Sequence, residues 1–133
     1  MLNARNSRKL RVLIVDDYPV ARRVFISELA PYSVDTFEAG DAAEALALAA
    51  QHHPDVVVLD LFLTGSSGLE VARELRARRG GHRIVIIALS GHAGEEYRKS
   101  AAQAGCDRYL VKPCTTEQLV EAIEEILPLR TAA

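Results

Sequence analysis

Five short apolar runs, separated by longer segments with helical periodicity, constrain the fold of this chain more than any other feature. Each run spans four to six residues, and the runs occupy 10–15, 34–38, 56–59, 84–89 and 108–111. Most of them are apolar on both faces, which predicts parallel strands buried between helices. Strands that alternate with helices are joined by right-handed crossovers. The sequence therefore predicts an α/β fold in which helices cover both faces of one parallel sheet.

The segments between these runs carry the signals that begin and end helices. Pro19 suits the first turn of a helix, where its missing N–H costs nothing. Three residue pairs have the spacing of a capping box: Asp41 with Glu44, Ser67 with Glu70, and Thr115 with Gln118. Gly105 predicts the end of the fourth helix. The last helix carries an apolar stripe that we expect to face the sheet: Leu119, Ile123, Ile126 and Leu127.

Length and composition predict one ordinary domain. The 133 residues fit a single domain at 10–128, with tails at 1–9 and 129–133. A net charge of −2 gives no basic excess for direct binding of nucleic acid. The first apolar run ends at Asp16, too early for a signal peptide or a membrane span, so a cytoplasmic protein is expected. Cys106 and Cys114 lack the spacing of a metal site and are interpreted as reduced thiols.

Polar residues follow four of the five predicted strands. In a parallel sheet the carboxyl ends of all strands lie at one edge, which is where ligands bind. The residues that the topology would bring to this edge are Asp16 and Asp17 after the first strand, Asp60 after the third, Ser90 after the fourth, and Lys112 with Pro113 after the fifth. Three carboxylates, a hydroxyl and an ammonium are therefore expected to converge.

Adjacent carboxylates beside an apolar core need a cation or a hydrogen-bonding partner, because each is costly to remove from water and they repel one another. Oxygen ligands that are few and leave room for water suit Mg²⁺ better than zinc. An aspartate close to a divalent cation and a lysine is also a competent nucleophile toward a phosphoryl group. Asp60 is the candidate nucleophile, and Ser90 and Lys112 would then bind the phosphate oxygens.

These separated positions, in this order, make the chain resemble the receiver domain of two-component response regulators, of which the chemotaxis regulator is one form. The resemblance runs from about residue 10 to residue 127. It implies that Asp16 and Asp17 are the metal-binding acid pair and Asp60 is the phosphoacceptor and a metal ligand. It further implies the following roles: Ser90 as the switch hydroxyl, Tyr109 as a switch aromatic that turns inward, and Lys112 as the lysine of the site.

The resemblance also implies a flavodoxin-like, doubly wound sheet of five parallel strands in the order 2-1-3-4-5, within three layers. The Lys112–Pro113 bond is expected to be cis, and the backbone carbonyl of Phe62 would bind the metal. Phe62 and His92 would flank the path of the water that hydrolyses the phosphoryl group. The chain departs from the common pattern at Leu63 and Thr64, where Met-Pro is frequent, and at Cys114, where phenylalanine is frequent.

The function implied is a signalling switch that catalyses its own phosphorylation and dephosphorylation, rather than an enzyme. A histidine kinase or a phosphotransfer protein would supply the phosphoryl group, and a downstream protein would bind the face of the fourth helix, fifth strand and fifth helix. The chain would be a stand-alone regulator or the receiver of a larger protein.

Two other functions are alternatives to the switch. A haloacid-dehalogenase-like phosphohydrolase also uses an aspartate at a strand end, but it needs a second acid where this chain has Phe62. A pseudo-receiver scaffold would usually lack one of the key residues, and none is missing here.

Overall fold

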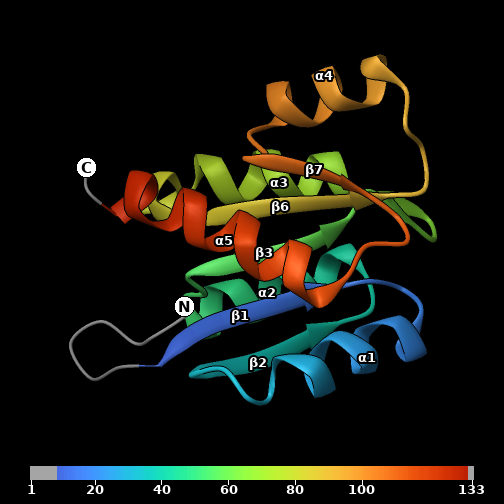
Figure 1. Cartoon of the computed structure of the whole chain (residues 1–133). Helices are drawn as coiled ribbons and strands as arrows, with labels where there is room; N and C mark the ends of the chain where they lie inside the picture. The colour runs from blue at the N-terminus through green and yellow to red at the C-terminus, as the bar shows by residue number, and fades with distance from the viewer. Residues whose placement is uncertain (1–8, 132–133) are drawn as a thin grey trace.

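A parallel sheet of five strands forms the middle layer of the chain, whose computed structural model describes residues 9–131 (Figure 1). The strands of this sheet are β1 (Leu10–Val15), β2 (Val34–Ala39), β3 (Val56–Asp60), β6 (Val85–Ser90) and β7 (Arg108–Val111). They lie in the order β2-β1-β3-β6-β7. Because β6 and β7 are the fourth and fifth strands of this sheet, the predicted order 2-1-3-4-5 is confirmed, as is the flavodoxin-like class.

In the part of the chain that the structure describes, five helices cover the two faces of the sheet. They are α1 (Pro19–Leu29), α2 (Ala42–His52), α3 (Gly68–Ala77), α4 (Glu95–Ala104) and α5 (Thr116–Thr131). One apolar core contains buried residues of α2, α3 and α4, and the other contains buried residues of α1 and α5. None of the helices in residues 9–131 combines the length and the apolar character needed to cross a bilayer.

The central strand β3 explains why the runs are apolar on both faces. All of its residues are buried. Val57 and Leu59 pack into the core under α2, α3 and α4, whereas Val56 and Val58 pack into the core under α1 and α5. The predicted stripe of α5 is buried in that second core as well. A strand alternates its side chains between the two faces, so a strand buried on both must be apolar throughout.

The predicted helix caps form at Asp41 and Thr115, whereas the cap at Ser67 differs. Asp41 Oδ1 accepts from the Glu44 N–H at 2.8 Å. Thr115 and Gln118 exchange both bonds of a capping box, at 2.8 and 3.0 Å. The Ser67 hydroxyl instead accepts from the N–H of Leu69 at 3.1 Å, one residue earlier than the expected partner Glu70.

Two further elements are absent from the sequence prediction, and α5 is longer than predicted. A hairpin of β4 (Phe62–Leu63) and β5 (Ser66–Ser67) follows β3, and a single 3-10 turn, η2 (Gly81–Arg83), precedes β6. Helix α5 continues through Pro128 to Thr131, into the segment 129–133 that was expected to be a tail. The Arg130 guanidinium holds this last turn, because it binds Asp107 Oδ1 at 2.6 Å. Of the other expected tail, 1–8 lie outside the described residues.

Candidate functional site

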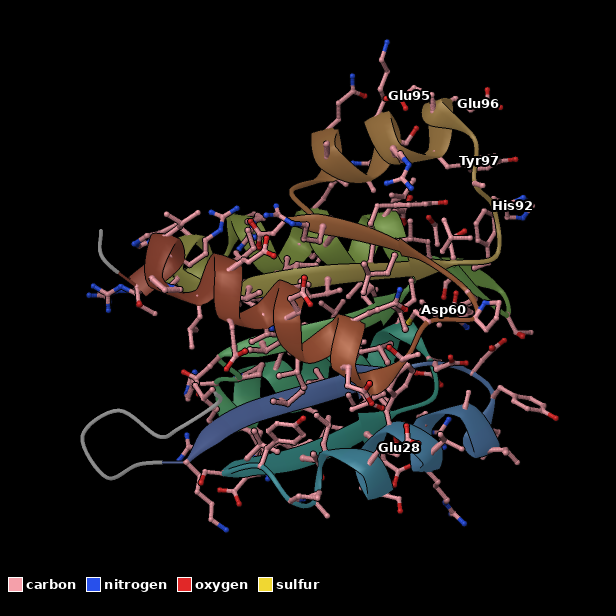
Figure 2. The ribbon with its side chains drawn as sticks, viewed as in Figure 1. Glu28, Asp60, His92, Glu95, Glu96 and Tyr97 are labelled. Carbon is pink, nitrogen blue, oxygen red and sulfur yellow. The ribbon has the colours of Figure 1, made fainter. Side chains whose placement is uncertain are left out.

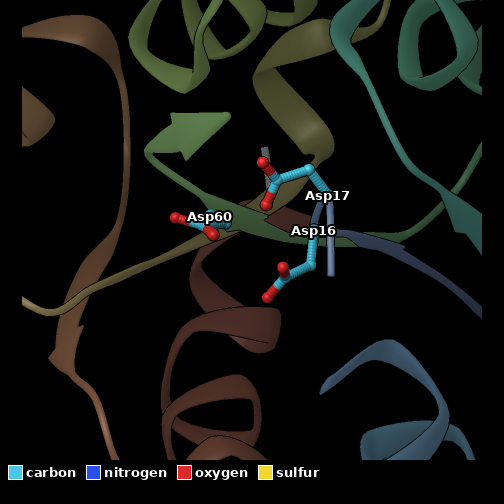
Figure 3. A group of neighbouring side chains, drawn as sticks. All are labelled: Asp16, Asp17 and Asp60. Atoms are coloured by element: carbon cyan, nitrogen blue, oxygen red, sulfur yellow. The ribbon is translucent and has the colours of Figure 1, made fainter. Parts of the chain in front are cut away.

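Three carboxylates meet at the carboxyl edge of the sheet (Figure 3). Asp16 and Asp17 follow β1, and Asp60 is the last residue of β3. Strands β1 and β3 are direct neighbours, with Val15 opposite Leu59, so the residues that follow them are also neighbours. One oxygen from each carboxylate lies within 4.8 Å of the others. Asp16 and Asp60 are buried, at 2% and 6% exposure, and Asp17 is half-buried.

The Lys112 ammonium bridges two of these carboxylates. Its Nζ donates to Asp16 Oδ2 at 3.0 Å and to Asp60 Oδ2 at 3.1 Å. Burial alone would lower the pKa of Lys112, but the hydrogen bond to Asp16 and the charge of Asp60 outweigh it and raise that pKa. Lys112 is therefore fully charged at neutral pH. The Lys112–Pro113 peptide bond is cis, as the resemblance implied.

Asp60 is a poorly solvated charge, with 6% of its surface exposed. Burial raises the pKa of its carboxyl group, although the N–H of Phe62, at 2.9 Å from Asp60 Oδ1, and the charge of Lys112 both oppose the rise. A carboxylate that is poorly solvated and more basic than usual is a better nucleophile. The chemistry expected of Asp60 is compatible with these surroundings.

Thr64 binds the third carboxylate, a contact that the sequence did not reveal. Both its backbone N–H, at 2.9 Å, and its hydroxyl group donate to Asp17 Oδ2. The hydrogen bond from the Thr64 side chain is the main reason that the pKa of Asp17 is lowered. In the sequence, Thr64 stands out only as a departure from a common Met-Pro pattern. A proline at this position would offer neither donor.

The donor set fits a hard divalent cation. The cluster supplies carboxylate oxygens from Asp16, Asp17 and Asp60, with no histidine or cysteine among its members. Oxygen-only sets of this kind are typical of Mg²⁺ and Ca²⁺, whereas Zn²⁺ prefers nitrogen and sulfur. The cluster contains three carboxylates, and Lys112 supplies one positive charge to it. The net negative charge that remains can be neutralised by a bound cation.

Ser90 lies on β6, between β3, which ends at Asp60, and β7, which Lys112 follows. It ends β6 and is completely buried. Strand β6 pairs with β3, with Asp60 opposite Leu89, and with β7, with Ser90 opposite Val111. The Ser90 hydroxyl accepts from the N–H of His92 at 3.1 Å. A hydroxyl group can accept and donate at the same time, so this bond leaves its proton available to a further acceptor.

Tyr109 is already inside the molecule. Its ring is buried on β7, and its hydroxyl group donates to the backbone carbonyl of His92. The guanidinium of Arg98, on α4, lies over the ring at 5.2 Å from its centroid and donates to the Tyr109 carbonyl at 3.3 Å. The sequence predicts a tyrosine that turns inward on phosphorylation, and in this structure the Tyr109 ring lies inward.

Three aromatic side chains contact one another, and we call Phe62, His92 and Tyr97 the ring cluster. Figure 2 labels His92 and Tyr97 of this cluster. Ring centroids of Phe62 and His92 are 4.6 Å apart. Phe62 itself is half exposed. Phe62 and His92 were predicted to flank the site, but Tyr97 was not predicted. It lies on α4, and nothing in its sequence context indicates that the fold brings it to the other two rings.

Comparison with known proteins finds relatives that are similar to this chain in sequence. The family model for the response regulator receiver domain matches residues 12–124. The nitrate/nitrite response regulator homolog of Haemophilus influenzae is 37% identical over 122 residues, which cover 89% of this chain and 57% of that protein. The polar-differentiation response regulator DivK of Brucella ovis is 31% identical over 116 residues, covering 87% of this chain and 94% of that protein.

A solved structure from Burkholderia pseudomallei has the same fold. It is a response regulator protein with a phosphorylated aspartic acid, a calcium ion and citrate, and it is 26% identical to this chain. The TM-score is 0.82, and the match covers 93% of this chain and 72% of that one.

Proposed function

Because the chain belongs to the response regulator receiver family of two-component signalling, we propose that it is a switch controlled by phosphorylation of Asp60. The observation that carries the proposal is the position of the Asp60 carboxylate, buried within the acid cluster and 3.1 Å from the Lys112 ammonium. The Burkholderia structure, with its phosphorylated aspartic acid and calcium ion, supports the same chemistry by analogy.

The proposed reaction is a transfer from phosphohistidine. A carboxylate oxygen of Asp60 attacks the phosphorus, the new O–P bond forms, and the P–N bond breaks so that the imidazole leaves with the electron pair and takes up a proton. Lys112 stabilises the charge on the transferring oxygens. Mg²⁺ held by Asp16, Asp17, Asp60 and the Phe62 carbonyl would neutralise further charge on those oxygens.

After transfer, the buried hydroxyl of Ser90 and the ammonium of Lys112 are the proposed donors to the phosphoryl group. Ser90 already accepts from the N–H of His92, and the carbonyl of His92 accepts from Tyr109. A shift of Ser90 toward the phosphoryl group would therefore move the loop that contains His92, whose carbonyl accepts the hydrogen bond from Tyr109. We propose that this loop carries the signal to the face formed by α4, β7 and α5.

The proposed partners are a histidine kinase or phosphotransfer protein and a downstream protein that binds this face. The chain spans 57% of the nitrate/nitrite relative and 94% of DivK, so the partners and output of the whole regulator are part of the proposal. We also propose the cytoplasm as its location, where Cys106 and Cys114 would remain the thiols that they are in the structure.

The proposal is tested by incubation of the chain with acetyl phosphate and Mg²⁺. We expect one phosphoryl group per chain by intact mass, and its release by hydroxylamine, to which an acyl phosphate is labile. Incorporation that is independent of a divalent cation, or that resists hydroxylamine, would contradict an aspartyl phosphate.

Mg²⁺ should raise the melting temperature, because it binds the folded acid cluster and not the unfolded chain. A free concentration 100 times the Kd adds about 2.7 kcal/mol to the free energy of unfolding. Asp17→Asn removes one charge of the cluster, so its melting temperature should respond less. Thermal unfolding of both proteins across a Mg²⁺ titration, at constant ionic strength, measures the effect. A parent melting temperature that does not change with millimolar Mg²⁺ would rule out the metal site.

Phe62→Asn should shorten the lifetime of the phosphoryl group. Water must approach the phosphorus in line, and we propose that the Phe62 ring excludes it, whereas an amide there would admit and hold it. The decay of phosphorylated chain in excess Mg²⁺, after removal of the donor, measures this. His92→Ala controls for a histidine that acts on the same water. Decay of Phe62→Asn that is no faster than that of the parent would contradict a gating role for the ring.

A further inference from the structure

We propose that Tyr97 sets the lifetime of the phosphoryl group by holding Phe62 and His92 in place beside Asp60. This inference rests on the proposed function and deepens it, because it adds a positioning residue on a different element. The water path would then be controlled from α4, the helix at which we propose that partners bind.

The three rings of the ring cluster close a triangle. Tyr97 is stacked on His92, with centroids 4.6 Å apart and planes 26° apart. It meets Phe62 edge to face, at 6.0 Å. Phe62 and His92 complete the triangle at 4.6 Å. The rings come from three segments, the hairpin after β3, the loop after β6 and the first turn of α4, so the cluster ties these segments together.

Tyr97 packs against the apolar core under α2, α3 and α4, whereas the rings of Phe62 and His92 border solvent. His92 is exposed and Phe62 is half exposed. A cavity of about 450 Å³ lies between the hairpin and α4, and both Phe62 and Tyr97 line it, beside Leu61, Leu69 and Ser100. Side chains that border open solvent on one side and a cavity on the other can move when a neighbouring ring is removed. Loss of the Tyr97 ring would therefore allow the side chains of Phe62 and His92 to move.

The backbone of His92 is held separately from its ring. Its N–H donates to Ser90 and its carbonyl accepts from Tyr109, and neither bond involves Tyr97. Removal of the Tyr97 ring should thus leave the loop and the switch hydroxyl in place while it frees the side chains over the water path. This separation allows a test in which the lifetime changes and phosphorylation itself does not.

The test compares the decay of phosphorylated parent, Tyr97→Ala and Tyr97→Phe in excess Mg²⁺ after removal of acetyl phosphate. We expect Tyr97→Ala to decay about 2- to 10-fold faster, the range that one aromatic pair contributes to an equilibrium. Tyr97→Phe keeps the ring and should decay like the parent. Lys99→Ala is the matched control, because it is an exposed residue of the same helix and outside the ring cluster.

A double-mutant cycle separates positioning from a general effect on the helix. If Tyr97 acts through Phe62, the changes in rate from Phe62→Ala and Tyr97→Ala should combine to less than their product. Full multiplication of the two effects, a parent-like rate in Tyr97→Ala, or equal acceleration in Tyr97→Phe would each overturn the inference. Melting temperatures check folding, and Tyr97→Leu replaces Tyr97→Ala if that variant unfolds.

The same experiment distinguishes this inference from the proposed function. A parent chain that never acquires the phosphoryl group would refute both. A parent that is phosphorylated on Asp60, with unchanged decay in Tyr97→Ala, would refute only the role of Tyr97.

Discussion

Asp60→Asn is expected to abolish phosphorylation by acetyl phosphate completely. The amide is not a nucleophile toward phosphorus, and it cannot replace the negative oxygen that Lys112 binds at 3.1 Å. Asp16 is equally close to Lys112, but we assign it to the metal and expect no incorporation there. Intact mass after incubation with donor and Mg²⁺ measures the loss. Asp35→Asn, an exposed carboxylate on β2, is the matched control and should be phosphorylated like the parent.

The same substitution should leave the metal-free fold as stable as before, or more so. Burial raises the pKa of Asp60, so its folded state favours the protonated, uncharged form. Such a group stabilises the fold below its unfolded pKa, and this contribution is lost as the pH rises through the folded pKa. At neutral pH the buried carboxylate therefore lowers the free energy of unfolding, and the neutral amide removes this loss of stability.

Stoichiometric incorporation of phosphoryl groups that persists in Asp60→Asn would disprove the assignment of Asp60, and peptide mapping would then locate the true acceptor.

Lys112→Ala should slow phosphorylation by roughly 10²- to 10³-fold, the usual effect of removing one donor that stabilises charge in a transition state. It should also destabilise the metal-free chain, because Asp16 Oδ2 and Asp60 Oδ2 both lose their cation. Breaking a fully buried pair costs more, but a third of the Lys112 side chain is exposed, so we expect about 1–3 kcal/mol.

Two measurements check the role of Lys112. The initial rate of incorporation should fall in Lys112→Ala and partly recover in Lys112→Arg, which keeps the charge with a different shape. Chemical unfolding should show the lower stability of Lys112→Ala, and Mg²⁺ should restore much of it by supplying positive charge to the same carboxylates. A variant that is phosphorylated at the parent rate would remove Lys112 from the reaction.

The sheet and the acid cluster could be predicted because both follow from periodicity and topology. The runs at 10–15 and 108–111 coincide with β1 and β7, those at 34–38 and 56–59 end one residue before β2 and β3 do, and the run at 84–89 lies one residue before β6. Once these strands are parallel, Asp16, Asp60 and Lys112 must reach the same edge, and their hydrogen bonds confirm that they do. The order of the strands came from the family resemblance.

The contacts that sequence did not reveal depend on the geometry of one short turn and on contacts between residues far apart in the sequence. The β4–β5 hairpin has two-residue strands, too short for any alternation to be visible, and it turns at Gly65, whose φ is 76°. Only this turn brings Thr64 to Asp17. The last turn of α5 depends on the ion pair of Arg130 with Asp107, which are far apart in the sequence. Tyr97 reaches the ring cluster through the placement of α4, which no local pattern reports.

Helix α4 is anchored to the rest of the molecule mainly at its C-terminal end. Its two buried residues, Ala101 and Ala104, both lie in the C-terminal half. At that end Gly105 has a φ of 105°, and its carbonyl accepts from Arg76 Nε of α3 at 2.9 Å. The opposite end begins after Gly94 without a side-chain cap. A helix of this length spans about 15 Å, so a rotation of about 10° about Gly105 would displace its N-terminal end, and with it Tyr97 of the ring cluster, by about 2–3 Å.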